Sequence, residues 1–477
     1  MKKIVAILMG ISMLISVTAC GKVGNQDAAI PGKTNEELAK QYDASIIELS
    51  DTRITVDGEA ISSNEDGAVY AANDIVFYLE GQDFTYGEGT KDDGHSQEEA
   101  DKHTVIHIAE PGNYIVSGTL SAGQIAVDLG KDADEDLDAR VTLILNNLDI
   151  TCSVAPGVIF YNVYECGDKD KEDADKDVNT VGAGANVILA DGSVNTVNGS
   201  YVAKIYKSVE LNEAGTEVVD SKKLHKYDAA FYSKRSMNVN GDENGTGVLN
   251  INAENEGLDT ELHLTINGGT IHINSGNDGI NTNEDGISVT TINGGNLNIV
   301  VNGSTGEGDG IDSNGWLVIN GGTVTSAAYG KSMDSGIDSD KGIHINGGVV
   351  MATGNMLDEI AESESNYVVF SSMEATEEGT VFAIKNEKGN VVCEYAAPNA
   401  FTYLVMASDQ LKEGTYTLWK NDVQMSVAKT EGNMPGMMMP RGKFPGGNWG
   451  AAMQDMEMQT EFTISAGGNM FIMAEEE

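Results

Sequence analysis

The chain has 477 residues, of which 56 are Gly and only 7 are Pro, and 6% are aromatic. Its 74 Asp and Glu residues against 29 Lys and Arg residues give a formal net charge of −45. Such a surface repels phosphate backbones and anionic headgroups, so we expect no nucleic-acid partner. The length allows one long repeat domain plus a smaller unit.

Residues 1–20 have the pattern of a bacterial lipoprotein signal peptide. Two lysines follow Met1, residues 4–17 are apolar, and small residues precede Cys20. The apolar run is too short to span a bilayer. The pattern predicts cleavage before Cys20 and its lipid modification, which would anchor the chain to the outside of a bacterial cell membrane. The alternative is a plain secretory signal with an incidental cysteine.

The first half of the remaining chain is irregular. Residues 21–53 are polar and aperiodic apart from a weak helical pattern, and we interpret them as a tether. Short alternating segments follow, such as 104–108 and 114–120, and alternation of this length predicts strands. Acidic stretches at 88–102, 131–138 and 167–177 are too polar to pack and are predicted to loop out, and 203–226 is a further insertion.

Two short motifs recur together in the second half. Ile-Asn-Gly-Gly and Gly-Ile-Asp-Ser, with close variants of the second, each occur four times, and successive Ile-Asn-Gly-Gly motifs are 26, 27 and 26 residues apart. They begin at Ile266, Ile292, Ile319 and Ile345, and at Gly257, Gly279, Gly310 and Gly336. A period in the twenties with β-branched and turn residues predicts an all-β solenoid with one coil per repeat, over residues 54–355. The Asn-Gly-Gly residues are assigned to turns and to a ladder of stacked Asn side chains.

The pattern changes after the last repeat. Residues 356–432 contain strands separated by tight turns and are interpreted as a cap, because an open solenoid edge would recruit other chains. Residues 433–477 are interpreted as a Met/Gly/Pro-rich loop followed by a final strand near 461–465.

The Gly-Ile-Asp-Ser motif carries the functional prediction. Because Ile faces the core, strand alternation directs the neighbouring acid outward. Stacking then produces two outward columns, one of Asp259, Asn281, Asp312 and Asp338, the other of Glu261, Asn283, Asn314 and Asp340. Two carboxylates ~4.8 Å apart repel by roughly 3–4 kcal/mol at an effective dielectric near 20. Such oxygen-rich clusters suit Ca²⁺. The predicted metal ligands are Asp259, Asp278, Asp309, Asp312, Asp334, Asp338 and Asp340; the alternative is a solvated acidic face.

The repeats, together with residues 114–128, 190–193 and 229–234, resemble the bacterial carbohydrate-binding β-helix family over most of residues 55–430. The resemblance implies a right-handed parallel β-helix similar in fold to pectate lyases, with calcium bound by aspartates. It also implies binding of cellulose or an acidic, pectin-like polysaccharide at the cell surface. We therefore expect a monomeric surface lipoprotein that binds polysaccharide and is not an enzyme.

Two alternatives remain open. A calcium-dependent polysaccharide lyase needs a base to remove a proton, and Lys331 is the one plausible residue beside the acid cluster. The other alternative is a non-enzymatic surface adhesin or envelope protein whose β-helix is mainly a stalk. For direct sugar contact the repeats offer Trp316 and Tyr329, with Asn314 nearby. This shortage of aromatic residues favours a cation-bridged acidic glycan over cellulose.

Overall fold

The computed structural model describes residues 31–167, 170–361, 363–430 and 457–474. The predicted signal peptide with Cys20, the first part of the tether and most of the Met/Gly/Pro-rich loop lie outside the described residues. The described chain is all-β with mainly parallel pairing, and its strands form sheets of 21, 9, 5 and 2 strands. None of the helices in these residues is long and apolar enough to cross a membrane.

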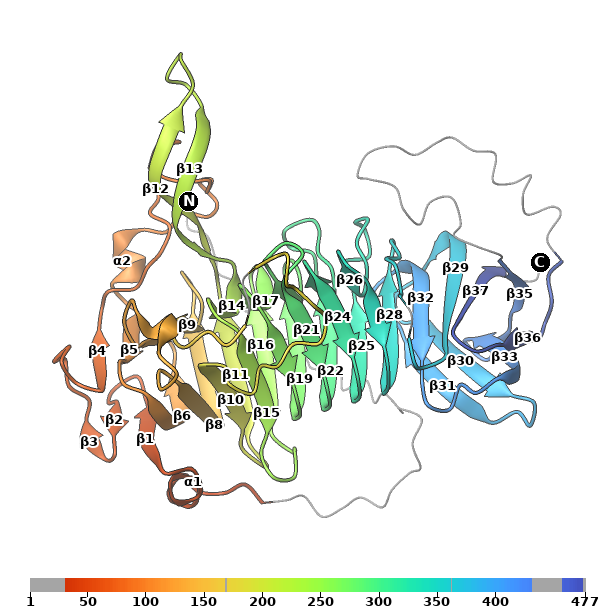
Figure 1. The fold of residues 1–477 in the computed structure, drawn as a ribbon, viewed down its shortest axis with the longest axis horizontal. Coiled ribbons are helices and arrows are strands. Elements are labelled where there is room, and N and C mark those ends of the chain that lie inside the picture. Colours follow the sequence, from red (N-terminus) through yellow and green to blue (C-terminus); the bar gives the residue numbers. More distant parts are fainter. Residues whose placement is uncertain (1–30, 168–169, 362, 431–456, 475–477) are drawn as a thin grey trace, which may run out of the picture.

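Three parallel ladders of strands run along the long axis of the molecule (Figure 1). The first ladder consists of β5 (Thr104–Ile108), β7 (Gly123–Asp128), β9 (Val158–Asn162), β14 (Ala229–Ser233), β17 (Glu256–Thr260), β20 (Ile280–Thr282), β23 (Ile311–Ser313) and β26 (Asp338–Ser339), with β4 (Val69–Ala72) antiparallel at its end. The second consists of β6 (Gly112–Leu120), β8 (Val141–Cys152), β10 (Ala185–Leu189), β15 (Met237–Gly241), β18 (Leu264–Ile266), β21 (Val289–Ile292), β24 (Trp316–Ile319) and β27 (Ile343–Ile345). The third continues from the end of β8 through β11 (Val194–Gly199), β16 (Val248–Ala253), β19 (Thr270–Ser275), β22 (Asn296–Val301), β25 (Thr323–Ala327) and β28 (Val349–Gly354).

Each repeat contributes one strand to each ladder, which explains the sequence period. The Gly-Ile-Asp-Ser motif supplies the first ladder, and Ile-Asn-Gly-Gly ends the second and turns the chain into the third. The apolar residues of the first motif are buried, as predicted: Leu258, Ile280 and Ile311 have no exposed surface and Ile337 is 1% exposed. Full burial of such a side chain contributes about 1.5–3 kcal/mol, so this column is a large part of the core.

The Asn-Gly-Gly turns form the predicted ladder. The second Gly of each has a positive φ, between 79° and 85°, a conformation that favours glycine. Each Asn amide donates to the Asn oxygen of the preceding repeat at 2.9 Å; the series runs through Asn240, Asn267, Asn293, Asn320 and Asn346. These residues therefore form the turns and link each repeat to the next.

The Gly that opens each Gly-Ile-Asp-Ser motif is required by close packing between repeats. A Cβ on Gly310 would lie 2.3 Å from the carbonyl oxygen of Gly336, and one on Gly279 would lie 2.5 Å from that of Gly310. No side chain fits at that separation, so only Gly lets adjacent backbones approach here.

The insertions differ in structure. The one at 203–226 forms a two-stranded hairpin, β12 (Val202–Leu211) and β13 (Val218–Tyr227), which projects away from the ladders (Figure 1). The stretch 88–102 contains a short helix, α2 (Gln97–Ala100), and 131–138 contains a 3-10 turn, Ala133–Glu135. In the stretch 167–177, Lys171 lies against the position of Gly286, beside Lys341.

The predicted tether, 21–53, was wrong for residues 35–49. They form α1 (Asn35–Tyr42) and β1 (Ala44–Leu49), and β1 pairs in parallel with β6. Two short strands, β2 (Thr55–Val56) and β3 (Glu59–Ala60), follow.

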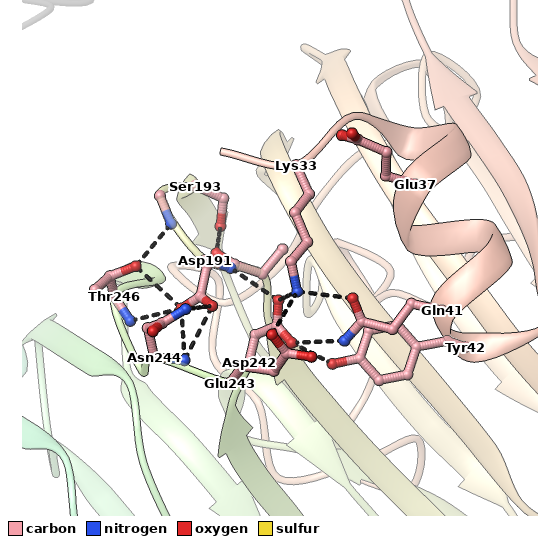
Figure 2. Close-up of polar contacts among 12 residues, drawn as sticks. Lys33, Glu37, Gln41, Tyr42, Asp191, Ser193, Asp242, Glu243, Asn244 and Thr246 are labelled. Atoms are coloured by element: carbon pink, nitrogen blue, oxygen red, sulfur yellow. Dashed lines mark hydrogen bonds and ion pairs between the residues drawn. The ribbon is translucent and has the colours of Figure 1, made fainter. Parts of the chain in front are cut away.

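Helix α1 is held against the rest of the protein by Asp242 (Figure 2). Its carboxylate accepts hydrogen bonds from Tyr42 Oη at 2.5 Å, Lys33 Nζ at 3.0 Å and Gln41 Nε2 at 3.0 Å. Because Asp242 is some 200 residues away along the chain, this docking leaves no local sequence signal.

The C-terminal region is strand-rich. Strands β29 (Tyr367–Thr376), β32 (Phe401–Ala407), β35 (Ser426–Lys429) and β37 (Gly468–Ala474) extend the large sheet, and β32 pairs antiparallel with β28. A second sheet contains β30 (Val381–Asn386), β31 (Val391–Ala396), β33 (Gly414–Lys420), β34 (Val423–Gln424) and β36 (Phe462–Ile464). The switch to antiparallel pairing covers the edge of the last repeat, and a separate apolar cluster lies beside it. Strand β36 agrees with the strand expected near 461–465, whereas β37 was not anticipated.

Candidate functional site

The acidic column of the first ladder is in the expected register. Asp259 pairs with Asn281, Asn281 with Asp312, and Asp312 with Asp338. The second column interlocks with it, because Asn283 Nδ2 donates to Asp259 at 2.7 Å and Asn314 Nδ2 donates to Asn281 at 3.3 Å. We call the two columns the acid face.

The acid face is less exposed than predicted. Asp259 is 1% exposed and Asn281 is 6% exposed, Asp312 and Asp338 are half-buried, and only Asp340 is exposed. The interpretation as a fully solvated face was therefore wrong for the first half of the column. Charged residues from outside the repeats, Lys226 and Asp228, are near enough to Asp259 to affect its pKa.

The buried end of the acid face carries unbalanced charge. Lys226 pairs with Asp228 at 2.8 Å, and Lys223 pairs with Glu261 at 3.1 Å. Neither Glu256 nor Asp259 has an ion pair with a described residue, and Glu256 Oε2 and Asp259 Oδ2 are buried without a hydrogen bond. Burial first, and then neighbouring carboxylates, raise the pKa of both groups well above its usual range. The acid face thus has one buried acceptor without a hydrogen bond, on Asp259, and Glu256 places a second beside it.

Three of the predicted ligands accept backbone hydrogen bonds from an adjacent repeat. The backbone N–H of Asp309 donates to Asp278 at 2.7 Å, that of Ser335 donates to Asp309 at 2.5 Å, and that of Gly308 donates to Asp334 at 2.6 Å. Burial followed by nearby charges raises the pKa of Asp278 to about 7 and that of Asp309 well above its usual range. These aspartates have a structural role in addition to any ligand role, since each uses one oxygen atom on the backbone.

The far end of the acid face contains Asp338 and Asp340. Burial, and then the charges of Asp358 and Asp312, raise the pKa of Asp338 to about 8. The pKa of Asp340 is raised by burial and by Asp285 and Asp358, although Lys171 and Lys341 oppose this shift. Basic residues therefore act on the exposed end of the acid face, at Asp340.

The residues proposed for direct sugar contact are engaged within the protein. Asn314 donates its amide to Asn281 and to the Thr282 carbonyl. The Trp316 ring is half-buried, with Lys341 Nζ 5.6 Å from its centroid. The ring of Tyr329 lies on Gly303, where a Cβ would be 2.1 Å from it, and packs against the core. Both aromatic residues are half-buried and contact other parts of the protein.

Lys331, the base required by the lyase alternative, is exposed. No ion pair joins it to a carboxylate in the described part of the chain. It is also absent from the charges that most affect Asp278, Asp309 and Asp338. The geometry therefore gives the lyase alternative no support.

The donor set of the acid face has the chemistry of a calcium site, because it consists of carboxylate and amide oxygens. Its geometry is only partly suitable. Within residues 31–167, 170–361, 363–430 and 457–474, no three Asp, Glu, His or Cys side chains are arranged to hold one metal ion. A cation on this face would therefore take at most two carboxylates from the chain, with amide, backbone or water oxygens completing its shell.

Two acids of this site were missed in the sequence. Glu256 directly precedes the first Gly-Leu-Asp-Thr motif, and Asp358 accepts a hydrogen bond from the Ser339 N–H at 3.0 Å. Residues 356–361 stack on the last repeat, with Ile360 bridged to Ile343 and Leu357 buried in the main core. The Leu-Asp pair at 357–358 is the signal that would have revealed an incomplete further repeat, although it follows Asp338 by only 20 residues.

The comparisons define the class of this protein. A family model described as carbohydrate-binding domain-containing protein matches residues 102–415. Because that match covers more than half of the chain, this protein belongs to the carbohydrate-binding domain-containing family.

Among solved structures, the chain is similar to the polysaccharide lyase-like protein from C. thermocellum, in its gadolinium derivative. The identity is 19%, the match covers 64% of this chain and 93% of that chain, and the TM-score is 0.33. Similarity of this degree supports no conclusion about function. No curated protein matches the chain.

Proposed function

We propose that this protein binds an extracellular polysaccharide along the acid face, and that Ca²⁺ bridges the carboxylates to an acidic, pectin-like glycan. Membership of the carbohydrate-binding family supports the general activity. The observation that supports this location is the in-register stack of Asp312 and Asp338 beside buried acids of raised pKa. Like charges held close together favour any partner that brings positive charge.

Calcium is preferred to a magnesium ion for this role. It accepts six to eight oxygen ligands in irregular arrangements, whereas Mg²⁺ demands near-ideal octahedral geometry. A column of oxygen donors at strand spacing provides many ligands but no compact cage. In the proposal Asp312 and Asp338 are the two carboxylate ligands from the chain, and the uronate carboxylates of the glycan complete the shell. Asp309, Asp334 and Asp340 add negative charge around the ion without binding it.

The test is retention of the full chain on immobilised polygalacturonate, with cellulose as the neutral comparison, in calcium and then in chelator. The double variant Asp312→Asn, Asp338→Asn should lose calcium-dependent retention, because Asn keeps the shape but removes the charge. Asp409→Asn, which removes one exposed carboxylate from the C-terminal region, is the control and should be retained as wild type is.

Two results would overturn the proposal. One is equal retention of the double variant and the wild type in calcium. The other is failure of the wild type to bind any polysaccharide on a glycan array that contains calcium, which would favour the stalk.

The finer fold and the location are part of the same proposal. The three parallel ladders, to which each repeat contributes one strand, support a right-handed parallel β-helix, and an experimental structure with left-handed crossings would contradict it.

The signal-like residues 1–20 support a lipid anchor at Cys20. In cells, Cys20→Ser should move the protein from the membrane fraction to the soluble fraction, and a variant that stays with the membrane would exclude this anchor.

A further inference from the structure

A pocket of about 260 Å³ lies where the β12–β13 hairpin meets the first ladder. Its lining includes Lys223, Lys226, Lys234 and Arg235, so that four of its twelve lining residues are Lys or Arg, compared with 29 of 477 in the whole chain. Three glutamates, Glu165, Glu261 and Glu284, also line the pocket, so its lining carries a formal charge of only +1. This near-neutral balance still distinguishes the pocket from a chain of net charge −45.

The pocket is continuous with the acid face. Tyr232 in β14 pairs in register with Asp259, the first acid of the column. Lys234 follows two residues later, as Glu261 follows Asp259, so these two residues take equivalent positions in adjacent repeats. Tyr232 Oη donates to Glu261 at 2.7 Å, which joins the pocket to the second column. A linear ligand on the acid face would therefore reach the pocket at one end.

Three of the four cations of the pocket already have an acidic partner: Lys223 pairs with Glu261, Lys226 with Asp228, and Arg235 with Asp134 through Nη2 at 3.0 Å. Glu165 accepts from the backbone N–H groups of Ser236 and Gly167, and Glu261 accepts from Tyr232 and Lys223. By contrast, Arg235 Nε is buried without an acceptor. Lys234 is exposed and has no ion pair with a described carboxylate. A buried donor left unpaired is destabilising, so a ligand that supplies an anionic oxygen would be favoured here.

The rest of the lining is suited to a sugar ring. Tyr227 packs edge-on against Tyr232, with ring centroids 5.2 Å apart, and Leu262 lies beside them. Aromatic and aliphatic surface next to a few charged groups is the usual composition of a small-molecule site. The volume is slightly below the roughly 300–1,000 Å³ of sites for drug-sized ligands, which favours one terminal residue over a long segment.

We propose that this pocket binds the carboxylate-bearing end of an acidic saccharide. Lys234 and Arg235 contact the carboxylate, and Tyr227 and Tyr232 contact the sugar ring. The inference rests on the proposed polysaccharide binding, because the chain that ends in the pocket is the one that lies along the acid face. The acid face then provides extended affinity, and the pocket provides recognition of a chain end.

The experiment measures binding of digalacturonate, and of the neutral galactose disaccharide, to the full chain by calorimetry in chelator at physiological ionic strength. The wild type should bind digalacturonate and not the neutral sugar. Lys234→Ala should weaken binding by about tenfold, the loss expected for one charge-assisted hydrogen bond. Lys234→Arg should restore affinity to within about threefold, because it keeps the charge and the donor.

Lys222→Ala is the matched control. Lys222 is an exposed lysine on β13, a strand of the hairpin beside the pocket, but it lies outside the pocket lining. Its loss changes the net charge equally and should alter affinity by less than about twofold. Thermal unfolding of each variant checks that it is folded. Equal binding of the two disaccharides, no binding of digalacturonate by the wild type, or equal losses for Lys234→Ala and Lys222→Ala would overturn the inference.

Failure of the pocket is distinguishable from failure of the proposed function. If polygalacturonate retention depends on Asp312 and Asp338 while digalacturonate does not bind, the acid face stands and the pocket inference fails. If digalacturonate binds through Lys234 while the polymer is not retained, the acid-face proposal fails.

Discussion

Asp312 and Asp338 are directly paired residues of adjacent parallel strands, β23 and β26. The backbone therefore holds two carboxylates at strand spacing, about 4.8 Å. Two predictions concern this pair of carboxylates, a third concerns the contact that docks α1, and a fourth concerns the close packing between repeats.

Neutralising one member of the pair should stabilise the calcium-free protein. Above about pH 8, where the Asp338 carboxyl is ionised, Asp338→Asn removes a charge that those of Asp358 and Asp312 oppose. At such a pH the free energy of unfolding should rise by about 1 kcal/mol, the repulsion of two charges at this spacing in water. The measurement is the thermal midpoint in chelator, with Asp409→Asn as the control. A lower midpoint for Asp338→Asn would mean that its contacts outweigh the repulsion.

Calcium should stabilise the wild type and leave the double variant Asp312→Asn, Asp338→Asn nearly unchanged. A ligand at 100 times its dissociation constant raises the free energy of unfolding by about 2.7 kcal/mol. Thermal unfolding in chelator, in Ca²⁺ and in equimolar Mg²⁺ measures this effect. Equal shifts with both ions, or an equal calcium shift in the double variant, would indicate general screening of charge.

The contact that docks α1 should make part of the stability depend on acid pH. Burial raises the pKa of Asp242, but the hydrogen bonds from Tyr42 and Lys33 outweigh it and lower the value to about 2, from 3.8 for the free group. Because the folded-state pKa is the lower one, the stabilisation is complete above about pH 4 and is lost as the pH falls towards 2.

Asp242→Asn should therefore unfold more easily than wild type at pH 7, by up to about 2 kcal/mol, and this difference should shrink towards pH 2. Urea unfolding as a function of pH gives the measurement. Glu243→Gln is the control. Glu243 is the exposed neighbour of Asp242, and its Oε2 lies 3.5 Å from Lys33 Nζ, the lysine that also contacts Asp242. A difference that does not change with pH would exclude this titration as the cause.

The motif glycines should tolerate no side chain. Gly310→Ala places a Cβ 2.3 Å from the Gly336 carbonyl and should lower the free energy of unfolding by about 1–3 kcal/mol or more, the usual cost of overpacking. Gly182→Ala is the control, because its Cβ would meet neighbours at 3.6 Å or more. Urea unfolding should separate the two variants, and equal stability would show that the repeats can move apart.

The repeat architecture was predictable because its causes are local. Strand alternation puts Ile311 in the core and Asp312 on the opposite side, and the period of the motifs sets which residues stack. The glycines and asparagines of the turns can likewise be interpreted from their own backbone preferences, as the positive φ angles show.

The electrostatic character of the acid face was not predictable, because distant segments create it. Lys226 and Asp228 reach Asp259 from the end of an insertion, Lys171 approaches Asp340 from another, and Asp358 follows the last motif out of period. The docking of α1 depends on Asp242 for the same reason. Periodicity therefore determined the order and spacing of the side chains in the stack. Only the tertiary structure decided which of these carboxylates are buried, because burial and pKa depend on whichever segment packs over the column, however distant it is in sequence.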